Sequence, residues 1–208
     1  EPKMADVTIG ADIETFVKRF PFKATESQLN AIESIRNDFK RGYPMSRLFE
    51  GDVGSGKTAV AATTIYAVSN AKFPGKDYGN LQTAYMVPTE ILAKQHYENF
   101  ISYFNHLPIK IGLITGSECK IFPSKSDSTK PTKISRTQLL KWVANGEVPI
   151  IIGTHALIQK SVAFKHLAFV VIDEQHRFGT LQRQKLTTKS PEGNSALPHL
   201  LSMTATPI

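Results

Sequence analysis

The sequence predicts an α/β fold in which a doubly wound, mainly parallel sheet lies between two layers of helices. Apolar, strand-like runs alternate with helical segments along the chain, which is the pattern of successive βαβ units. Several of these runs are apolar at almost every position, as expected for strands that are covered on both faces. Most of them end in a polar or glycine-containing segment. In a parallel sheet such segments would gather along one edge and form one site.

The expected helices follow from the spacing of apolar residues and from capping signals. The first contains Ile13 and Phe20 at helical spacing and ends before Pro21, because proline disfavours helix in the preceding residue. The second opens with the capping-box pattern 25–28 and should bury one face, formed by Leu29, Ile32, Ile35 and Phe39. Further helices are expected near residues 58–68, 89–100, 135–143 and 180–186.

Strands are expected near residues 45–49, 83–87, 110–115, 148–152, 167–172 and 199–203. The segments 72–82 and 117–133 should be exposed connections. The second is rich in Ser, Thr, Lys and Pro, and we expect Pro123 and Pro131 to exclude a regular element across it. We interpret it as a solvated loop and assign no DNA contact to it.

The composition is that of a soluble globular protein, with 208 residues, 41% hydrophobic and 21% charged residues. No apolar run approaches the ~20 residues of a membrane span, so no membrane partner is expected. The formal net charge of +7 favours an acidic partner such as nucleic acid, although nucleotide phosphates would also profit from it. Cys119 is the single cysteine, which excludes an intrachain disulfide and fits a cytoplasmic location.

A phosphate-binding loop organises the chain. Its eight residues fit the pattern G-x-x-x-x-G-K-[ST] at every fixed position, between a strand-like run and a helix, and they are Gly51, Asp52, Val53, Gly54, Ser55, Gly56, Lys57 and Thr58. Backbone N–H groups and the positive end of the following helix would surround phosphate oxygens. Lys57 would reach the β- and γ-phosphates, and the Thr58 hydroxyl would be one ligand of Mg²⁺. The alternative is an ordinary Gly/Ser-rich turn.

Hydrolysis also needs a metal ligand and a group that orients the attacking water. Asp173 ends the strand-like run 167–172 and can hold Mg²⁺, while Glu174 can activate the water. His176 would lie near the γ-phosphate, where a neutral imidazole could respond to hydrolysis. Two solvated acids that end a strand, and a packed histidine, are the structural alternatives.

The ordered motifs of the chain resemble those of superfamily 2 helicases, and in detail the RecG family of bacterial DNA helicases. The resemblance covers nearly the whole chain and is carried by GDVGSGKT (51–58), PTEILAKQH (88–96), GTHAL (153–157), DEQHRFG (173–179) and MTATPI (203–208). It implies a RecA-like P-loop NTPase lobe with a three-layer architecture that uses ATP and Mg²⁺. We expect residues 25–208 to form this lobe and residues 1–24 to supply a helix and lead-in.

The resemblance also implies roles for individual residues. Gln28 matches a motif that recognises adenine through its amide, whereas its place in a capping box gives it a structural alternative. Six residues match stretches along the DNA track of such motors, namely Thr89, Glu90, Thr115, Gly116, Thr154 and His155. Three match the motif that couples the nucleotide site to DNA movement, namely Ser202, Thr204 and Thr206. Helix capping is the alternative for the threonines.

The same resemblance implies that the intact protein moves along double-stranded DNA and remodels branched structures, such as stalled forks and Holliday junctions, in recombination and repair. Nothing in the chain matches the second RecA-like lobe, whose arginines would complete the ATP site. An arginine of this kind contributes about 10³- to 10⁵-fold to the rate in related P-loop enzymes. We therefore expect the chain to be part of a longer protein and, alone, to hydrolyse ATP weakly and not to unwind DNA.

Three other functions fit parts of the pattern. The motor of a transcription-repair coupling factor shares the P-loop and the terminal motif, but Gln175 stands where that relative generally has Glu. A P-loop switch or small-molecule kinase is disfavoured because the chain has no Asn-Lys-x-Asp motif and carries the acidic motif 173–176. A nucleic-acid-binding module with a vestigial nucleotide site would show steep salt dependence without a nucleotide effect.

Overall fold

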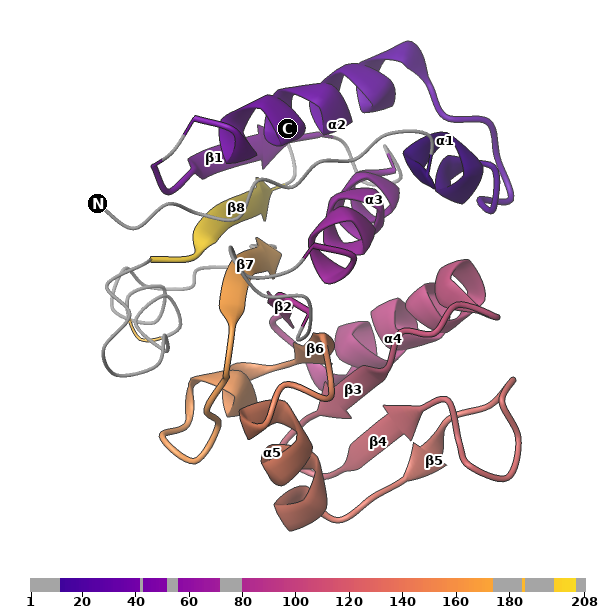
Figure 1. The fold of residues 1–208 in the computed structure, drawn as a ribbon, viewed down its shortest axis with the longest axis vertical. Coiled ribbons are helices and arrows are strands. Elements are labelled where there is room, and N and C mark those ends of the chain that lie inside the picture. The colour runs from indigo at the N-terminus through magenta and orange to yellow at the C-terminus, as the bar shows by residue number, and fades with distance from the viewer. Residues whose placement is uncertain are drawn as a thin grey trace.

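The computed structural model describes residues 12–41, 43–51, 56–71, 80–173, 185 and 197–204. The helices are α1 (Asp12–Val17), α2 (Glu26–Phe39), α3 (Lys57–Ser69), α4 (Glu90–Phe104), α5 (Arg136–Ala144) and the 3₁₀ helix η1 (His155–Ile158) (Figure 1). The strands are β1 (Ser46–Glu50), β2 (Gln82–Met86), β3 (Ile111–Ile114), β4 (Cys119–Phe122), β5 (Thr132–Lys133), β6 (Ile150–Gly153), β7 (Leu167–Asp173) and β8 (His199–Thr204).

The described strands form one sheet in the order β1-β8-β7-β2-β6-β3-β4-β5. All pairings from β1 through β3 are parallel, and only the β3–β4 and β4–β5 pairings within this sheet are antiparallel. Every residue of β7 is buried, as expected for a strand covered on both faces. The predicted mainly parallel α/β fold is therefore confirmed.

The segment 117–133 is not the irregular loop that we expected. Cys119, Ile121 and Phe122 of β4 are buried, and β4 pairs with β3 in a tight antiparallel hairpin. Pro123 directly follows β4 and Pro131 directly precedes β5. The prolines therefore lie outside the short strands, where no ladder hydrogen bond is needed from them. The expectation was wrong because apolar side chains in 119–122 can add to the sheet edge and be buried.

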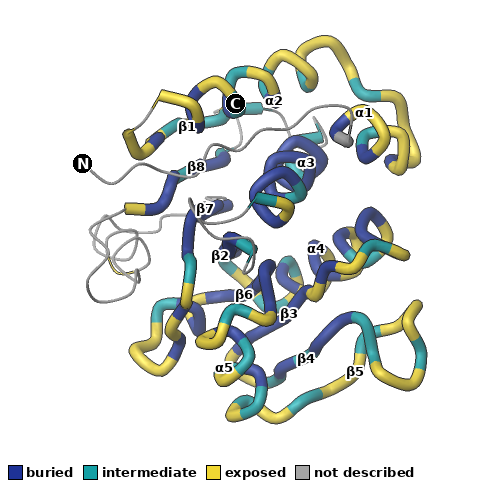
Figure 2. The backbone as a smooth tube through the Cα atoms, viewed as in Figure 1, coloured by how far each residue is buried: buried dark blue, intermediate teal, exposed yellow. Residues whose placement is uncertain are grey.

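Two hydrophobic cores cover the two faces of the sheet, and alternate strand residues point into each. Tyr85 and Val171 belong to the core shared with α1, α2, α3 and α4. Met86 and Ile172 belong to the core shared with α5 and η1. Figure 1 shows α3 and α4 on one side of the sheet and α5 on the other, and the strands between them are mostly buried (Figure 2).

Helix α2 begins with the predicted capping box. The Thr25 hydroxyl accepts from Gln28 N at 3.2 Å, and Gln28 Oε1 accepts from Thr25 N at 2.9 Å. Ile32, Ile35 and Phe39 are buried as expected, but the Leu29 side chain is 46% exposed. The first turn of α2 is largely exposed, so the buried face of this helix begins one turn later than the apolar pattern suggests.

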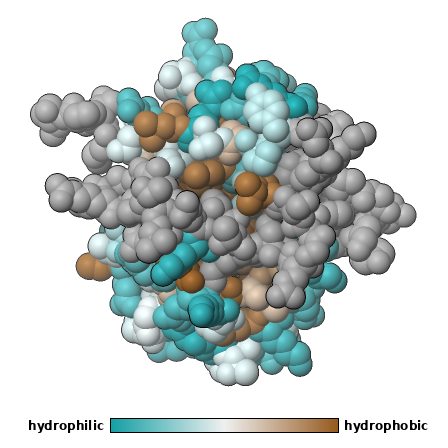
Figure 3. All heavy atoms as spheres, turned by 90° about the vertical axis from the view of Figure 1, so that its left-hand side faces the viewer, coloured by the Kyte–Doolittle hydropathy of each residue, from teal (hydrophilic) through white to brown (hydrophobic). Residues whose placement is uncertain are grey.

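Most other expected elements are confirmed with ends that differ by a few residues. Ser135 caps α5 by accepting from Gln138 N at 3.2 Å. The expected helix 180–186 lies outside the described residues apart from Lys185, and so do residues 72–79 of the expected connection 72–82. At its described end this connection is not exposed as expected, because Leu81 and Gln82 are buried and Gln82 begins β2. Across the described ranges no helix has the length and apolarity that a membrane crossing requires. On the face in Figure 3, hydrophobic side chains of described residues form small groups among hydrophilic ones.

Candidate functional site

The polar motifs lie at the carboxyl edge of the parallel strands. The phosphate-binding loop follows β1, Asp173 ends β7 and Thr204 ends β8. Residues 89–90 follow β2, residues 115–116 follow β3 and residues 154–155 follow β6. The edge therefore has two halves. The nucleotide half lies at the ends of the neighbouring strands β1, β8 and β7, and the second half, at the ends of β2, β6 and β3, carries the motifs that we expect to contact DNA.

In the nucleotide half, Lys57 is held by backbone carbonyl groups. Its Nζ atom donates to the carbonyl oxygen of Gly51 at 2.8 Å and to that of Thr204 at 3.0 Å. Gly51 N also donates to the Thr204 carbonyl at 3.2 Å. The first residue of the predicted P-loop, the first residue of α3 and the last residue of β8 therefore meet at one point. Asp52, Val53, Gly54 and Ser55 lie outside the described residues.

Gln28 lies against the end of the P-loop. Gly56 caps α3 in the left-handed region, with φ of 78°, which is accessible to glycine at little cost. A Cβ on Gly56 would overlap Nε2 of Gln28 and would lie 3.0 Å from its Cδ. The Oε1 atom of Gln28 belongs to the capping box while its amide nitrogen faces Gly56. Both sequence interpretations of Gln28 are therefore compatible with its position.

Asp173 and Thr58 could hold a divalent cation. Asp173 is only 4% exposed and its Oδ1 has no hydrogen-bond partner among the described residues. Thr58 lies in the first turn of α3, directly after the P-loop lysine. A carboxylate and a hydroxyl from the protein, with waters and phosphates as the remaining ligands, are what Mg²⁺ requires. Glu174 and His176 lie outside the described residues.

Two residues that the sequence did not mark for this site lie beside Asp173. Tyr85 of β2 is fully buried, and burial, followed by the negative charge of Asp173, raises its pKa far above the usual range, while the Thr58 hydroxyl opposes this rise. His96 of α4 places its Nε2 atom 3.4 Å from Oδ2 of Asp173. The one available signal was that His96 ends the motif 88–96, whereas nothing in the sequence pattern distinguished Tyr85 from a core residue.

In the second half of the edge, Glu90 connects α4 to the turn after β3. Its Oε1 accepts from Ser117 N and its Oε2 accepts from Ser117 Oγ, both at 3.1 Å. The hydrogen bond from the Ser117 hydroxyl is the main reason why the pKa of Glu90 is lowered. Thr89 caps α4 by accepting from Leu92 N at 3.2 Å, so its capping alternative is real. Thr115 is buried and its hydroxyl accepts from Ser117 N and Glu118 N.

Thr154 and His155 are brought next to this turn by a close approach of two strands. Thr154 N donates to the Ile114 carbonyl at 3.3 Å. A Cβ on Gly153 would overlap that same carbonyl oxygen, so only glycine permits this approach. Thr154 is buried, whereas His155 is exposed at the start of η1.

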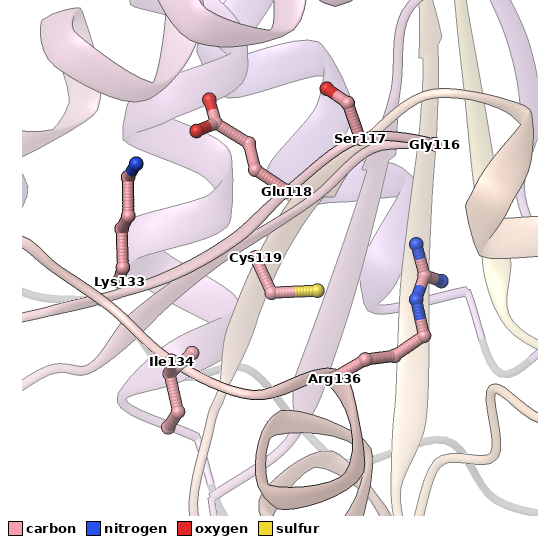
Figure 4. A pocket seen from close by; sticks show the side chains of 7 residues that line it. All are labelled: Gly116, Ser117, Glu118, Cys119, Lys133, Ile134 and Arg136. Atoms are coloured by element: carbon pink, nitrogen blue, oxygen red, sulfur yellow. The ribbon is translucent and has the colours of Figure 1, made fainter.

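Beside this turn lies a pocket of about 370 Å³, which the sequence did not predict (Figure 4). Arg136 of α5 donates through Nη2 to the Thr115 carbonyl at 2.6 Å, and its Nη1 is buried without a hydrogen-bond partner among the described residues. The Cys119 side chain points toward Arg136 in Figure 4, and burial raises the pKa of its thiol. The remaining lining residues are Gly116, Ser117, Glu118, Lys133 and Ile134.

The expected coupling residues lie on or after β8, next to the nucleotide half. Ser202 is buried and pairs in register with Leu48 of β1 and Ile172 of β7. Thr204 is partly exposed and supplies the carbonyl group that Lys57 contacts. Thr206 lies outside the described residues.

The mainly parallel sheet and the site along its carboxyl edge define the chain as a RecA-like domain of the P-loop NTPase class. A model of the family described as DEAD/DEAH box helicase matches residues 25–208. The chain belongs to this family.

Several proteins similar to this chain are named RecG. The chain is 44% identical over 199 residues to ATP-dependent DNA helicase RecG of Synechocystis, and the matched segment spans 96% of the chain and 21% of that protein. It is 42% identical over 197 residues to RecG of Bacillus subtilis, with 95% of the chain and 25% of that protein covered. The chain thus spans about a fifth to a quarter of the length of these relatives.

Solved structures give the same result. A structure of RecG bound to a three-way DNA junction superposes with a TM-score of 0.72 at 38% identity, covering the whole chain and 24% of that protein. A DEAD box protein from Methanococcus jannaschii has a TM-score of 0.65 at 19% identity, covering 97% of the chain and 49% of that protein. The second similarity concerns the fold alone.

Proposed function

We propose that this chain is the ATP-binding lobe of an ATP-dependent DNA helicase or translocase that acts on branched double-stranded DNA. The observation that carries the proposal is the division of one sheet edge into a P-loop half and a half with the turns 89–90, 115–118 and 154–155. The similarity to RecG over more than nine-tenths of the chain supports DNA as the partner.

In the nucleotide half, we assign phosphate binding to Lys57 and to the N–H groups at the start of α3. Lys57 Nζ would exchange its carbonyl contacts for β- and γ-phosphate oxygens. Thr58 and Asp173 would hold Mg²⁺, which would neutralise charge that develops on the phosphates. Glu174 would accept a proton from the attacking water, and His176 would respond to the γ-phosphate. Gln28 would donate from its amide to adenine.

In the second half, we assign contacts with the DNA backbone to the turns after β2, β3 and β6. Thr89 and Gly116 are exposed, and their hydroxyl and N–H groups would be donors of the kind that commonly bind nucleic-acid phosphates. Thr115 and Thr154 are buried and would shape these turns. The hydrogen bonds that Ser117 donates to Glu90 and that Arg136 donates to Thr115 hold the turn 115–118 in place.

We further propose that a second RecA-like lobe of the same protein closes the ATP site, and that stalled forks and Holliday junctions are its substrates in repair and recombination. The partial coverage of the RecG relatives supports the first part, because they are four to five times longer than the matched segment. Arginines of that second lobe would then complete the ATP site for hydrolysis.

The proposal is tested by titrating the whole protein with Mg·ATP and Mg·GTP, beside the variants Lys57→Ala and Gln28→Ala. We expect adenine-selective binding that the first variant loses and the second makes less selective. A second arm compares stimulation of ATP hydrolysis by a three-way junction and by linear duplex at one salt concentration. Equal binding of ATP and GTP would remove adenine recognition from Gln28. Junction binding without any effect on hydrolysis would contradict the motor function.

A further inference from the structure

The contact between His96 and Asp173 joins the two halves of the site. Asp173 ends β7, which belongs to the nucleotide half, while His96 lies on α4, the helix that follows β2 in the other half. Their side chains approach to 3.4 Å between Nε2 and Oδ2. Thr89 caps the start of the same helix, and Glu90, its first residue, accepts a hydrogen bond from Ser117 in the turn 115–118. One helix therefore reaches both the expected metal site and the expected DNA track.

Several buried polar atoms around this contact have no hydrogen bond among the described residues. They are Nδ1 and Nε2 of His96 and Oδ1 of Asp173. His96 is 9% exposed, Asp173 is 4% exposed and Tyr85 is fully buried, and the rings of Tyr85 and His96 are 5.2 Å apart. Buried polar atoms normally have partners, and a cluster of unsatisfied ones calls for an explanation. Ordered water and a cation held by Asp173 would satisfy them.

We propose that His96 positions Asp173 for Mg²⁺ and that α4 thereby links the metal site to the turn 115–118. This rests on the proposed function in so far as it takes Asp173 as the metal ligand. The imidazole Nε2–H would donate to Oδ2 of Asp173, so that Oδ1 would be available as the ligand of the cation. Partners of this kind orient the ligands of a metal site and typically change metal affinity by about 10- to 100-fold.

The link along α4 follows from the geometry of the helix. Glu90 and His96 are six residues apart, which corresponds to roughly 9 Å along the helix axis. The two hydrogen bonds from Ser117 to Glu90 fix one end of this span to the turn after β3. A helix is stiff over such a length, so a displacement of the turn 115–118 would shift His96 relative to Asp173. DNA that engages the turn would in this way alter the affinity for Mg²⁺.

The test compares the whole protein with His96→Ala, His96→Gln and Tyr97→Phe. The Gln amide nitrogen can replace Nε2 as a donor. The Tyr97 control removes a hydrogen bond that the neighbouring residue of α4 donates to the Ile111 carbonyl at 3.1 Å, and it leaves the side chains of His96 and Asp173 unchanged. ATP binding is measured at increasing Mg²⁺ and again in excess EDTA. Mn²⁺ binding is followed by electron paramagnetic resonance, which does not depend on turnover.

We expect His96→Ala to raise the Mg²⁺ concentration required for tight ATP binding by about 10- to 100-fold, with unchanged binding in EDTA. His96→Gln should recover much of the loss, and Tyr97→Phe should resemble the parent protein. Adding junction DNA should shift the Mg²⁺ requirement of the parent protein but not that of His96→Ala. If His96→Ala fails to fold, His96→Leu, which fills the space of the ring but has no donor, takes its place, and the same outcomes decide.

An unchanged Mg²⁺ requirement in folded His96→Ala would overturn the proposal, as would an equal loss with and without Mg²⁺. A DNA shift that survives in His96→Ala would overturn the link through α4. Failure of the parent protein to bind Mg·ATP at all would instead refute the proposed function, so the two failures are distinguishable.

Discussion

The ammonium group of Lys57 donates to the carbonyl oxygen of Thr204 at 3.0 Å, which joins the start of α3 to the end of β8. An ammonium has three N–H donors, and a second one contacts the Gly51 carbonyl at 2.8 Å. One donor is left for a phosphate oxygen if both contacts persist. Binding of both the β- and γ-phosphates would therefore draw Lys57 away from Thr204 or from Gly51. In the first case the end of β8 would lose a hydrogen bond when the nucleotide binds.

The first prediction concerns the Thr204 side chain. Because Lys57 contacts the backbone carbonyl of Thr204, the change Thr204→Ala preserves that acceptor. We expect Mg·ATP affinity to stay within about twofold of the parent protein, a difference below ~0.5 kcal/mol, while stimulation of hydrolysis by junction DNA falls. Fluorescent-nucleotide titration and steady-state hydrolysis measure the two quantities. Weakening of ATP binding as severe as that of Lys57→Ala would show that Thr204 acts on phosphate binding instead.

The second prediction separates the two roles of Gln28. The change Gln28→Glu keeps an oxygen acceptor for Thr25 N in the capping box but removes the amide donor that faces Gly56. We expect the stability to hold, since an acidic side chain is favourable in the first turn of a helix, while the preference for ATP over GTP is lost. Gln28→Ala should lose the preference and also about 1 kcal/mol of stability.

Thermal unfolding and competitive nucleotide titration of both variants check the Gln28 prediction. Retained selectivity in both variants, with reduced stability only in Gln28→Ala, would assign Gln28 to capping alone.

The sequence predicted most of the strands and helices along the chain because their signals are local. Residues 167–172 of β7 are apolar throughout, and the phosphate-binding loop has a fixed spacing. The strand β4 was missed because the composition of 117–133, rich in Ser, Thr, Lys and Pro, indicates a loop. What stabilises β4 is its pairing with β3 and the burial of Ile121 and Phe122, and both depend on residues outside this segment. Leu29 is an error in the opposite direction: its helical spacing with Ile32 predicted burial, but it lies in the exposed first turn of α2.

Within the candidate site, the sequence located residues that occur in recognisable motifs. It did not place Tyr85, His96 or Arg136 at their partners, because these contacts join elements far apart in the chain. The spacing between motifs carries no information about which side chains meet across neighbouring strands. The sequence therefore predicts which polar residues belong to the site. Which of their side chains contact one another becomes clear only when the order of the strands in the sheet is known.

The third prediction concerns Gln82, a fully buried amide at the start of β2. Its Nε2 donates to the carbonyls of Val143 and Val148 at 2.9 and 3.0 Å. Its Oε1 accepts from the N–H groups of Lys165 and His166, both at 2.9 Å. The amide thus satisfies backbone groups of segments near α5, β6 and β7.

We expect Gln82→Leu to lower the free energy of unfolding by about 3 kcal/mol, because two buried carbonyl groups and two partly buried N–H groups lose their partner. The matched control is Gln138→Leu, at a partly exposed position of α5, where the side chain is not part of this network. Urea denaturation of both variants measures the difference. A loss below ~1 kcal/mol for Gln82→Leu would mean that water replaces the amide in this space.

The fourth prediction is a dependence of stability on pH that originates at His199. This residue is 2% exposed, its Nδ1 accepts from Met45 N at 2.8 Å, and burial lowers its pKa to about 4 from an ordinary value of 6.5. The unfolded chain therefore binds more protons than the folded protein between these two pH values. Stability from the neutral imidazole is complete above pH ~6.5 and is lost as the pH falls toward ~4, by about 3 kcal/mol in total.

The change His199→Asn isolates this contribution, because the Asn oxygen can accept from Met45 N but does not titrate in this range. Urea denaturation of both proteins at several pH values from about 7 to 4 gives the difference in unfolding free energy at each pH. We expect the parent protein to lose stability relative to His199→Asn as the pH falls through this window, on top of the losses from carboxylates that both proteins share. Parallel pH profiles would show that His199 keeps its ordinary pKa in the folded protein, which its buried contact with Met45 argues against.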